Sequence, residues 1–304
     1  MKLNYEEILS KTKEIVIKAG EMVKEAFESR EIINSTIEIK DSNPTDLVTA
    51  VDKNVEKLLF TSLKEIYPSF LFIGEETVSS SESKKVNLTD SPTWIIDPVD
   101  GTTNFVHGYP FICISVGLSV KKDPVLGIIY NPILNEMYWG IKGKGAFLNG
   151  KQLPLVKNVP FKSLNKCLFV TEYGYFLGRE QTDIKMDNVK NLLSIPAHGF
   201  RALGSCALDI MQLARGGADA FFHIGMHIWD LAAAMVILRE TGGVMVSYKR
   251  PKEIDNNVLV VNEPYDICQR KVLCIRGVIE GKEHQSKLLE EIREKIRDFD
   301  IESD

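Results

Sequence analysis

Two stretches near the start of the chain carry apolar residues at helical spacing. The first runs from Ile8 to Phe27 and the second from Val51 to Ile66. In both, apolar positions recur every three or four residues, which places them on one face of a helix. The sequence therefore predicts two amphipathic helices that pack their apolar faces against a core.

Strand-like segments dominate the next part of the chain, up to about residue 155. The clearest covers residues 112–120, where apolar residues alternate with small ones, the period of a strand with two different faces. Asn149-Gly150 is a typical hairpin turn. The other predicted strands of this part are residues 71–73, 93–96, 125–130 and 136–139. This half is expected to form a largely antiparallel sheet beside the two helices.

After about residue 155 the pattern changes to strands alternating with helices. Ser205 is suited to cap a helix that runs to Arg215, and an apolar helix over 229–241 is expected to stop at Gly242-Gly243. Further predicted elements are strands at 168–171, 218–222, 258–261 and 272–275, a helix at 183–193 and a charged terminal helix. A layered α/β or α+β sandwich fits this order of elements.

Composition narrows the class of protein. Of the 304 residues, 44% are hydrophobic and 26% charged, which is ordinary for a soluble globular protein. The net charge is −5 without any basic block, which argues against a nucleic-acid partner or an anionic membrane surface. No apolar stretch reaches transmembrane length, and the first residues do not form a signal peptide. The five cysteines are scattered without C-x-x-C spacing, so we expect reduced thiols and a cytoplasmic protein.

The segment Trp94–Asn104 carries the strongest indication of chemistry. An apolar run ends in Asp97 and Asp100, separated by the rigid Pro98, and Gly101-Thr102-Thr103 follows. Carboxylates at this spacing can bind hard divalent cations, and the following backbone N–H groups can hold a phosphate where a helix begins. By itself the segment is also compatible with an ordinary turn.

Other acidic residues occupy similar junctions between an apolar element and a turn. Glu75 follows an apolar run, and Asp230 precedes an apolar helix. Taken singly, the first is compatible with a solvated loop, and the second with a carboxylate that complements a helix dipole. Asp52 lies near the start of the second helix, where Thr49-x-x-Asp52 matches a capping pattern. Together, Glu75, Asp97, Asp100 and Asp230 form an all-oxygen donor set that suits Mg²⁺.

Four motifs of the chain resemble those of the inositol monophosphatase family. Trp94–His107 and Trp229–Ala233 are similar to its two signatures, and residues 71–76 and 46–52 are similar to the flanking motifs. Other family landmarks, such as His198–Arg201 and Gly216–Asp219, appear in the same order. The resemblance covers most of the chain.

This resemblance implies a five-layer αβαβα sandwich of the sugar-phosphatase type. Its halves would be residues 1–155, with Glu75, Asp97 and Asp100, and residues 156–304, with Asp230 and substrate contacts, in one compact catalytic unit. The implied activity is Mg²⁺-dependent hydrolysis of inositol monophosphates by an activated water, without a covalent intermediate and with inhibition by Li⁺. The implied assembly is a homodimer, and the implied small-molecule partner is a phosphate monoester substrate.

The roles of individual residues are carried over from the same motifs. Two to three Mg²⁺ ions per subunit are implied: one would bind Glu75, Asp97 and the Val99 carbonyl, and one Asp97, Asp100 and Asp230. Thr102, paired with Asp52 and assisted by Glu75, would relay a proton, and Lys40 matches a basic residue near the metals. The implied substrate contacts are Asp100, Gly101, Thr102, Thr103, Gly204, Ser205, Cys206, His223 and Asp230.

Substrate selectivity is where this chain departs from the family pattern. His223 occupies the position of an acidic residue that accepts hydrogen bonds from the ring in inositol-specific members, and a neutral imidazole accepts only one. Cys206 replaces a smaller residue, and Tyr173 and Tyr175 lie in a stretch that is usually more polar. An alternative is therefore a phosphatase of another small sugar or polyol phosphate, and a more remote one is a non-catalytic family member.

Overall fold

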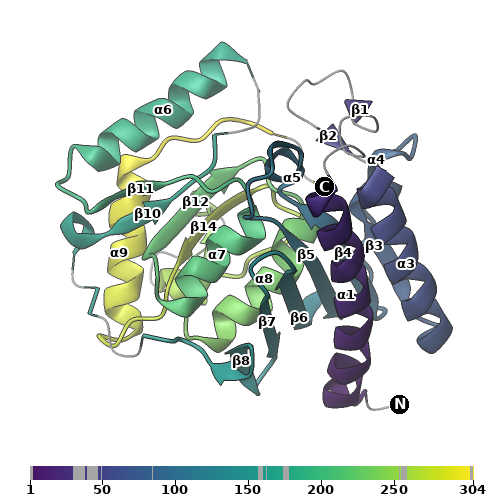
Figure 1. The fold of residues 1–304 in the computed structure, drawn as a ribbon. Coiled ribbons are helices and arrows are strands. Elements are labelled where there is room, and N and C mark those ends of the chain that lie inside the picture. Colours follow the sequence, from purple (N-terminus) through teal and green to yellow (C-terminus); the bar gives the residue numbers. More distant parts are fainter. Residues whose placement is uncertain are drawn as a thin grey trace.

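The computed structural model describes residues 3–29, 38–39, 47–48, 50–83, 85–156, 160–161, 163–173, 178–252, 254, 259–301 and 304. Helices and sheets alternate in five layers, which confirms the expected layered α/β sandwich (Figure 1). Within the described ranges no helix is both long and apolar enough to cross a membrane.

The first layer consists of the two predicted amphipathic helices, α1 (Tyr5–Glu28) and α3 (Ala50–Ile66). They cover the outer face of a seven-stranded sheet in the order β3-β4-β5-β6-β7-β8-β9. All neighbours in it are antiparallel except β3 and β4, as the predicted meander requires. The strands are β3 (Leu71–Gly74), β4 (Thr93–Asp100), β5 (Cys113–Val120), β6 (Asp123–Asn131), β7 (Glu136–Ile141), β8 (Gly145–Leu148) and β9 (Lys151–Gln152). A separate two-stranded pair, β1 (Glu38–Ile39) and β2 (Leu47–Val48), was not predicted.

Two helices, α7 (Cys206–Arg215) and α8 (Ile228–Glu240), form the central layer between the sheets. Helix α8 is apolar around its circumference because both of its sides are buried. At Gly127 on β6, an added Cβ would lie 2.4 Å from the Ala233 carbonyl oxygen. Only glycine permits the backbones of β6 and α8 to approach this closely. Helix α8 therefore packs directly against the first sheet, which fixes the position of its first turn.

The second sheet has five strands in the order β11-β10-β12-β14-β13. Helices α6 (Arg179–Leu193) and α9 (Lys282–Lys295) cover its outer face (Figure 1). Three apolar clusters fill the spaces between successive layers. The strands are β10 (Leu168–Val170), β11 (Gly199–Arg201), β12 (Ala220–Ile224), β13 (Val244–Ser247) and β14 (Lys271–Ile275).

The prediction of a strand over residues 258–261 is wrong for the part that the structure describes, residues 259–261. Val260–Asn262 forms a 3₁₀ turn, η3, whose Val260 is buried in the cluster beneath α9. A run of four apolar residues does not distinguish a strand from a buried turn. Strand β11 was missed because its three residues show no alternation, and α6 begins four residues before its predicted start. The proposed division of the chain at residue 155 stays a prediction.

Candidate active site

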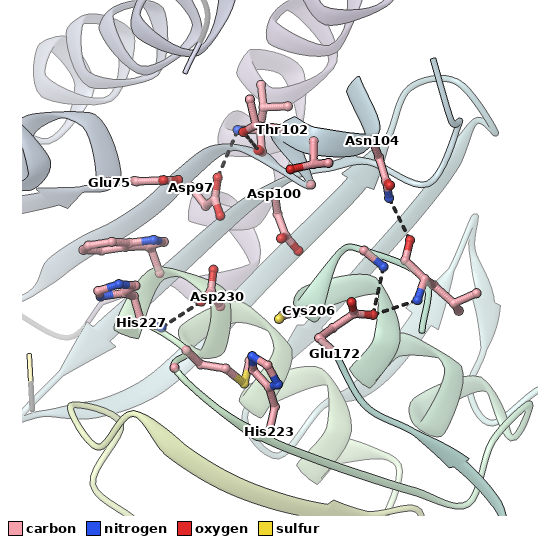
Figure 2. A pocket seen from close by; sticks show the side chains of 18 of the residues that line it. Glu75, Asp97, Asp100, Thr102, Asn104, Glu172, Cys206, His223, His227 and Asp230 are labelled. Atoms are coloured by element: carbon pink, nitrogen blue, oxygen red, sulfur yellow. Dashed lines mark hydrogen bonds between the residues drawn. The ribbon is translucent and has the colours of Figure 1, made fainter. Parts of the chain in front are cut away.

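A cavity of about 620 Å³ opens where β4 ends and the helices α4 (Glu75–Ser79), α5 (Thr102–His107), α7 and α8 begin. Figure 2 shows acidic side chains projecting into it from opposite walls, Asp97 and Asp100 from the first sheet and Asp230 from α8. The predicted residues that line the cavity are Glu75, Asp97, Val99, Asp100, Gly101, Thr102, Thr103, Gly204, Cys206, His223 and Asp230.

An irregularity in β4 turns two carboxylates toward the same cavity. The register of β4 against β5 shifts between Asp97 and Asp100, and the Val99 N–H donates to Asp97 Oδ1 at 3.0 Å. Asp100 Oδ2 accepts hydrogen bonds of 2.7 Å from the Ser205 hydroxyl and from the Ala207 N–H. These bonds fix the orientation of both carboxyl groups without any ligand.

Asp230 reaches the same point from the first turn of α8. Its Oδ2 accepts a hydrogen bond of 2.7 Å from the backbone N–H of His227, which completes a capping box. Oxygen atoms of Asp97, Asp100 and Asp230 lie within 4.8 Å of one another. Figure 2 places Glu75 next to Asp97. The structure therefore brings together the four acids that the sequence placed at separate junctions.

The electrostatics of this cluster favour a cation. Burial raises the pKa of Asp97 well above its usual value, and the charges of Glu75, Asp100 and Asp230 raise it further. Burial likewise raises the pKa of Asp100 to about 6 and that of Asp230 well above the ordinary range. None of the described residues that line the cavity is a lysine or arginine. Converging carboxylates, all hard oxygen donors, form a group that could hold a divalent metal ion.

Thr102 lies beside this cluster, at the first position of α5. Its hydroxyl is 3.1 Å from Asp52 Oδ1 on α3 and 3.1 Å from the Val99 carbonyl oxygen. Gly101 precedes it with φ +95°, a left-handed conformation in which a Cβ would also lie 3.0 Å from the Gly204 carbonyl. The glycine thus permits the sharp turn that begins α5 and leaves its first N–H groups without intrahelical partners.

The opposite side of the cavity is less charged. His223 on β12 lines it with only 5% of its surface exposed, and its Nδ1 has no hydrogen-bond partner. Burial, followed by the charge of Lys185, lowers the pKa of His223 well below its usual value. Burial raises the pKa of Cys206, so its thiol stays protonated. This side therefore offers a neutral imidazole and a thiol to the remainder of a substrate (Figure 2).

Ser205 has a different place from the one expected of a substrate contact. Its side chain is 1% exposed, caps α7 through Leu208 and donates to Asp100. Its position supports a role in orienting Asp100, whereas Gly204 and Cys206 on either side of it line the cavity. Lys40 and Tyr175 lie outside the described residues. Tyr173 is 39% exposed and does not line this cavity.

Two residues that support the cavity were not predicted. Glu172 Oε1 accepts hydrogen bonds from the N–H groups of Leu203, at 2.7 Å, and Gly204, at 2.8 Å. Asn104 Nδ2 donates to the Leu203 carbonyl at 2.7 Å and so joins α5 to the same loop. A signal for Glu172 existed, since it follows an apolar strand as Glu75 does. The contact between Asn104 and Leu203 had no such signal, because the two residues are 99 positions apart.

Asp209, on α7 behind the cavity, leads to a prediction about stability and pH. It is fully buried, neither carboxyl oxygen has a donor partner, and burial with the charge of Glu172 raises its pKa well above normal. The folded state thus favours the protonated form, which can donate to Glu172. Stability should fall as pH rises from the unfolded carboxyl pKa of about 4 toward the raised folded value. Asp209→Asn keeps a donor at every pH, so we expect it to raise Tm at pH 8 by a few degrees and much less at pH 5.

Thermal unfolding between pH 5 and 8.5 measures this effect. The matched control is Asp183→Asn, the same change at an exposed position on α6. Identical pH dependence in Asp209→Asn and the unaltered protein would contradict a protonated Asp209.

Comparison with known proteins gives consistent matches over nearly the whole chain. The family model described as "Inositol monophosphatase family" matches residues 4–297. Inositol monophosphatase 1 of Bos taurus is 45% identical over 255 residues, 84% of each chain, and that of Homo sapiens is 42% identical over 261 residues, 86% of each. The extragenic suppressor protein suhB of Bartonella henselae superposes with a TM-score of 0.74 at 25% identity, covering 95% of this chain and 98% of its own. The IMPase of Thermotoga maritima, at 24% identity, shares the fold with a TM-score of 0.73 over 96% of this chain and 100% of its own.

Proposed function

Because this chain belongs to the inositol monophosphatase family, we propose that it is a Mg²⁺-dependent phosphatase that hydrolyses inositol monophosphates to myo-inositol and phosphate. The observation that carries the proposal is the convergence of Asp97, Asp100 and Asp230, with oxygen atoms within 4.8 Å, at the wall of a cavity of about 620 Å³. A cavity of this size accommodates a small polyol phosphate.

The donor set supports magnesium as the metal. Glu75, Asp97 and the Val99 carbonyl would hold one ion, and Asp97, Asp100 and Asp230 a second, all through oxygen atoms. Mg²⁺ prefers such ligands and keeps several of its waters. When bound, it neutralises charge on the phosphoryl oxygens and lowers the pKa of water.

The chain's own groups then bind the phosphate and move the proton. Backbone N–H groups of Gly101, Thr102 and Thr103 at the start of α5 would bind phosphate oxygens. The Thr102 hydroxyl can accept a proton from the attacking water while its own proton passes to Asp52 Oδ1, 3.1 Å away. Ser205 and the Ala207 N–H hold Asp100 in place during this transfer.

The first test of the function is phosphate release from a panel of substrates with Mg²⁺, each with and without Li⁺. The panel contains inositol 1-phosphate, glucose 1-phosphate, galactose 1-phosphate, 2′-AMP and fructose 1,6-bisphosphate. We expect phosphate to be released fastest from inositol 1-phosphate, and we expect Li⁺ to inhibit this release. Release from none of them would contradict the proposal and favour a non-catalytic family member.

A second candidate keeps this chemistry but changes the substrate to another small sugar or polyol phosphate. The observation that favours it is His223, a buried neutral imidazole with an unpartnered Nδ1 on the side of the cavity away from the carboxylate cluster. An imidazole accepts fewer hydrogen bonds from ring hydroxyls than a carboxylate does.

We expect His223→Glu to raise kcat/KM for inositol 1-phosphate relative to galactose 1-phosphate by about tenfold, since a charged acceptor adds roughly 1.5 kcal/mol. The ratio of the two kcat/KM values is the measurement. His198→Glu makes the same change at an exposed position away from the cavity and serves as control. A ratio unchanged in His223→Glu would mean that residue 223 does not contact the ring.

Lithium inhibition, a homodimeric assembly and a cytoplasmic setting belong to the same proposal. They are supported by the family resemblance and, for the reducing setting, by five free cysteines, three of them buried. Light scattering of the purified protein tests the dimer, and the lithium arm of the panel tests the inhibition.

A further inference from the structure

The side-chain carboxylate of Asp304 lies at the start of α8, beside the cavity. The residues that it contacts there are far from it in sequence. Its Oδ1 is 2.6 Å from His227 Nδ1, and its Oδ2 accepts a hydrogen bond of 2.8 Å from the Ile228 N–H. Its own N–H donates to the Cys268 carbonyl at 3.1 Å. The side chain is only 6% exposed, so it is enclosed at the start of α8.

The imidazole of His227 is held from three directions. Arg270 Nη2 lies 2.9 Å from its Nε2, and a guanidinium can only donate, so Nε2 accepts and the ring proton is assigned to Nδ1. That proton points at Asp304 Oδ1. The ring also stacks on Trp229, with centroids 4.5 Å apart and planes 8° from parallel. The orientation of His227 therefore depends on Asp304 and Arg270 together.

Arg270 also fixes the loop that joins β12 to α8. Its guanidinium donates to the carbonyl oxygens of Gly225, at 3.1 Å, and Met226, at 3.2 Å. In return the Gly225 N–H donates to the Arg270 carbonyl at 2.8 Å. Gly225, Met226 and His227 line the cavity. The loop is thus bound on one side by Arg270 and on the other by Asp304.

This loop delivers the hydrogen bond that orients Asp230. The His227 N–H donates to Asp230 Oδ2 at 2.7 Å, and Figure 2 shows this bond with Asp230 beneath Asp97 and Asp100. We propose that Asp304 is a positioning residue for the metal site, which fixes His227 and the first turn of α8 so that Asp230 faces Asp97 and Asp100. The inference rests on the proposed function, because it takes Asp230 as a ligand of Mg²⁺.

A carboxylate at a helix N-terminus also stabilises the helix, so stability alone does not test the proposal. The decisive measurement is Mg²⁺ binding by titration calorimetry on the full chain. Loss of a group that supports a metal ligand typically weakens metal affinity by about 10–100-fold. We expect Asp304→Asn to raise the Mg²⁺ dissociation constant about tenfold, raise the Mg²⁺ concentration for half-maximal activity in parallel, and leave kcat at saturating Mg²⁺ within about twofold of the unaltered protein.

Asp300→Asn is the matched control, since that side chain is fully exposed, 3.9 Å from Lys271. An unchanged Mg²⁺ dissociation constant in Asp304→Asn would overturn the inference while leaving the proposed function intact. An unaltered protein that bound no Mg²⁺ would instead overturn the proposed function and this inference with it.

A second variant covers the case in which Asp304→Asn does not fold. His227→Gln retains an acceptor for Arg270 but loses the Nδ1–H group that donates a hydrogen bond to Asp304. It should therefore weaken Mg²⁺ binding to a similar extent. If Asp304 acts through His227, the double variant Asp304→Asn/His227→Gln should bind Mg²⁺ about as tightly as whichever single variant binds Mg²⁺ more weakly. Additive losses, or normal Mg²⁺ binding in His227→Gln, would overturn the proposed route.

Discussion

Replacing Asp97 with asparagine is expected to lower kcat/KM for every accepted phosphate monoester by about 10³-fold or more. Asp97 is the acid that both proposed metal sites share, and metal ions contribute several kcal/mol to stabilising charge in such reactions. Asp230→Asn should act in the same direction, because it removes the proposed ligand that α8 supplies. Phosphate release at saturating Mg²⁺ measures the loss.

The same substitution should make the metal-free protein more stable. Asp97 is 2% exposed and faces three other carboxyl groups, so without a cation its negative charge is destabilised by burial and by repulsion. Its raised pKa means that this penalty grows as pH rises above the ordinary carboxyl value. With EDTA at pH 7.5, Asp97→Asn should therefore unfold at a higher temperature, and the increase in Tm that Mg²⁺ causes in the unaltered protein should nearly vanish.

Asp90→Asn, an exposed residue ahead of the same strand, is the control for both measurements. Near-normal turnover in Asp97→Asn would rule out this carboxylate as a metal ligand. A lower Tm in EDTA would show that Asp97 supports the fold rather than straining it.

Local periodicity predicted most of the elements, because burial of one face leaves a pattern within ten to twenty residues. It identified α1 and α3, the meander of the first sheet and the capped helix α7. It did not identify β11, which is three residues long, and it misread 258–261, whose described part enters a turn that buries Val260. In both cases tertiary packing decides the conformation, not the local pattern: β11 pairs with β10, and Val260 packs in the apolar cluster beneath α9.

The acids of the site were predictable for a related reason. Each follows or precedes an apolar element, and the ends of such elements meet at one edge of a layered fold. Contacts that join distant segments had no comparable signal. Asn104 with the Leu203 carbonyl, and Asp304 with His227, are single polar residues whose partners lie 99 and 77 residues away. Such supporting bonds need the tertiary structure.

Replacing Thr102 with valine is the second change with a large expected effect. Valine keeps the shape of threonine but removes the hydroxyl that lies 3.1 Å from Asp52 Oδ1. Loss of a positioned proton-transfer group typically costs about 10²–10⁴-fold in rate. We expect kcat to fall by that amount while Mg²⁺ affinity changes little, since the carboxylates remain. Thr61→Val, on the exposed side of α3, is the matched control.

Two further variants separate proton transfer from packing. Thr102→Ser keeps the hydroxyl and should retain most of kcat, whereas Asp52→Asn keeps a hydrogen-bond acceptor but cannot take up the proton and should lose kcat about as severely as Thr102→Val. If Thr102 and Asp52 form one relay, the double variant should be no slower than the slower single variant, because the second change removes a step already lost. Turnover in Thr102→Val within about threefold of the unaltered protein would exclude the relay, and the proton would then have to leave through Glu75, the remaining acid beside Asp97.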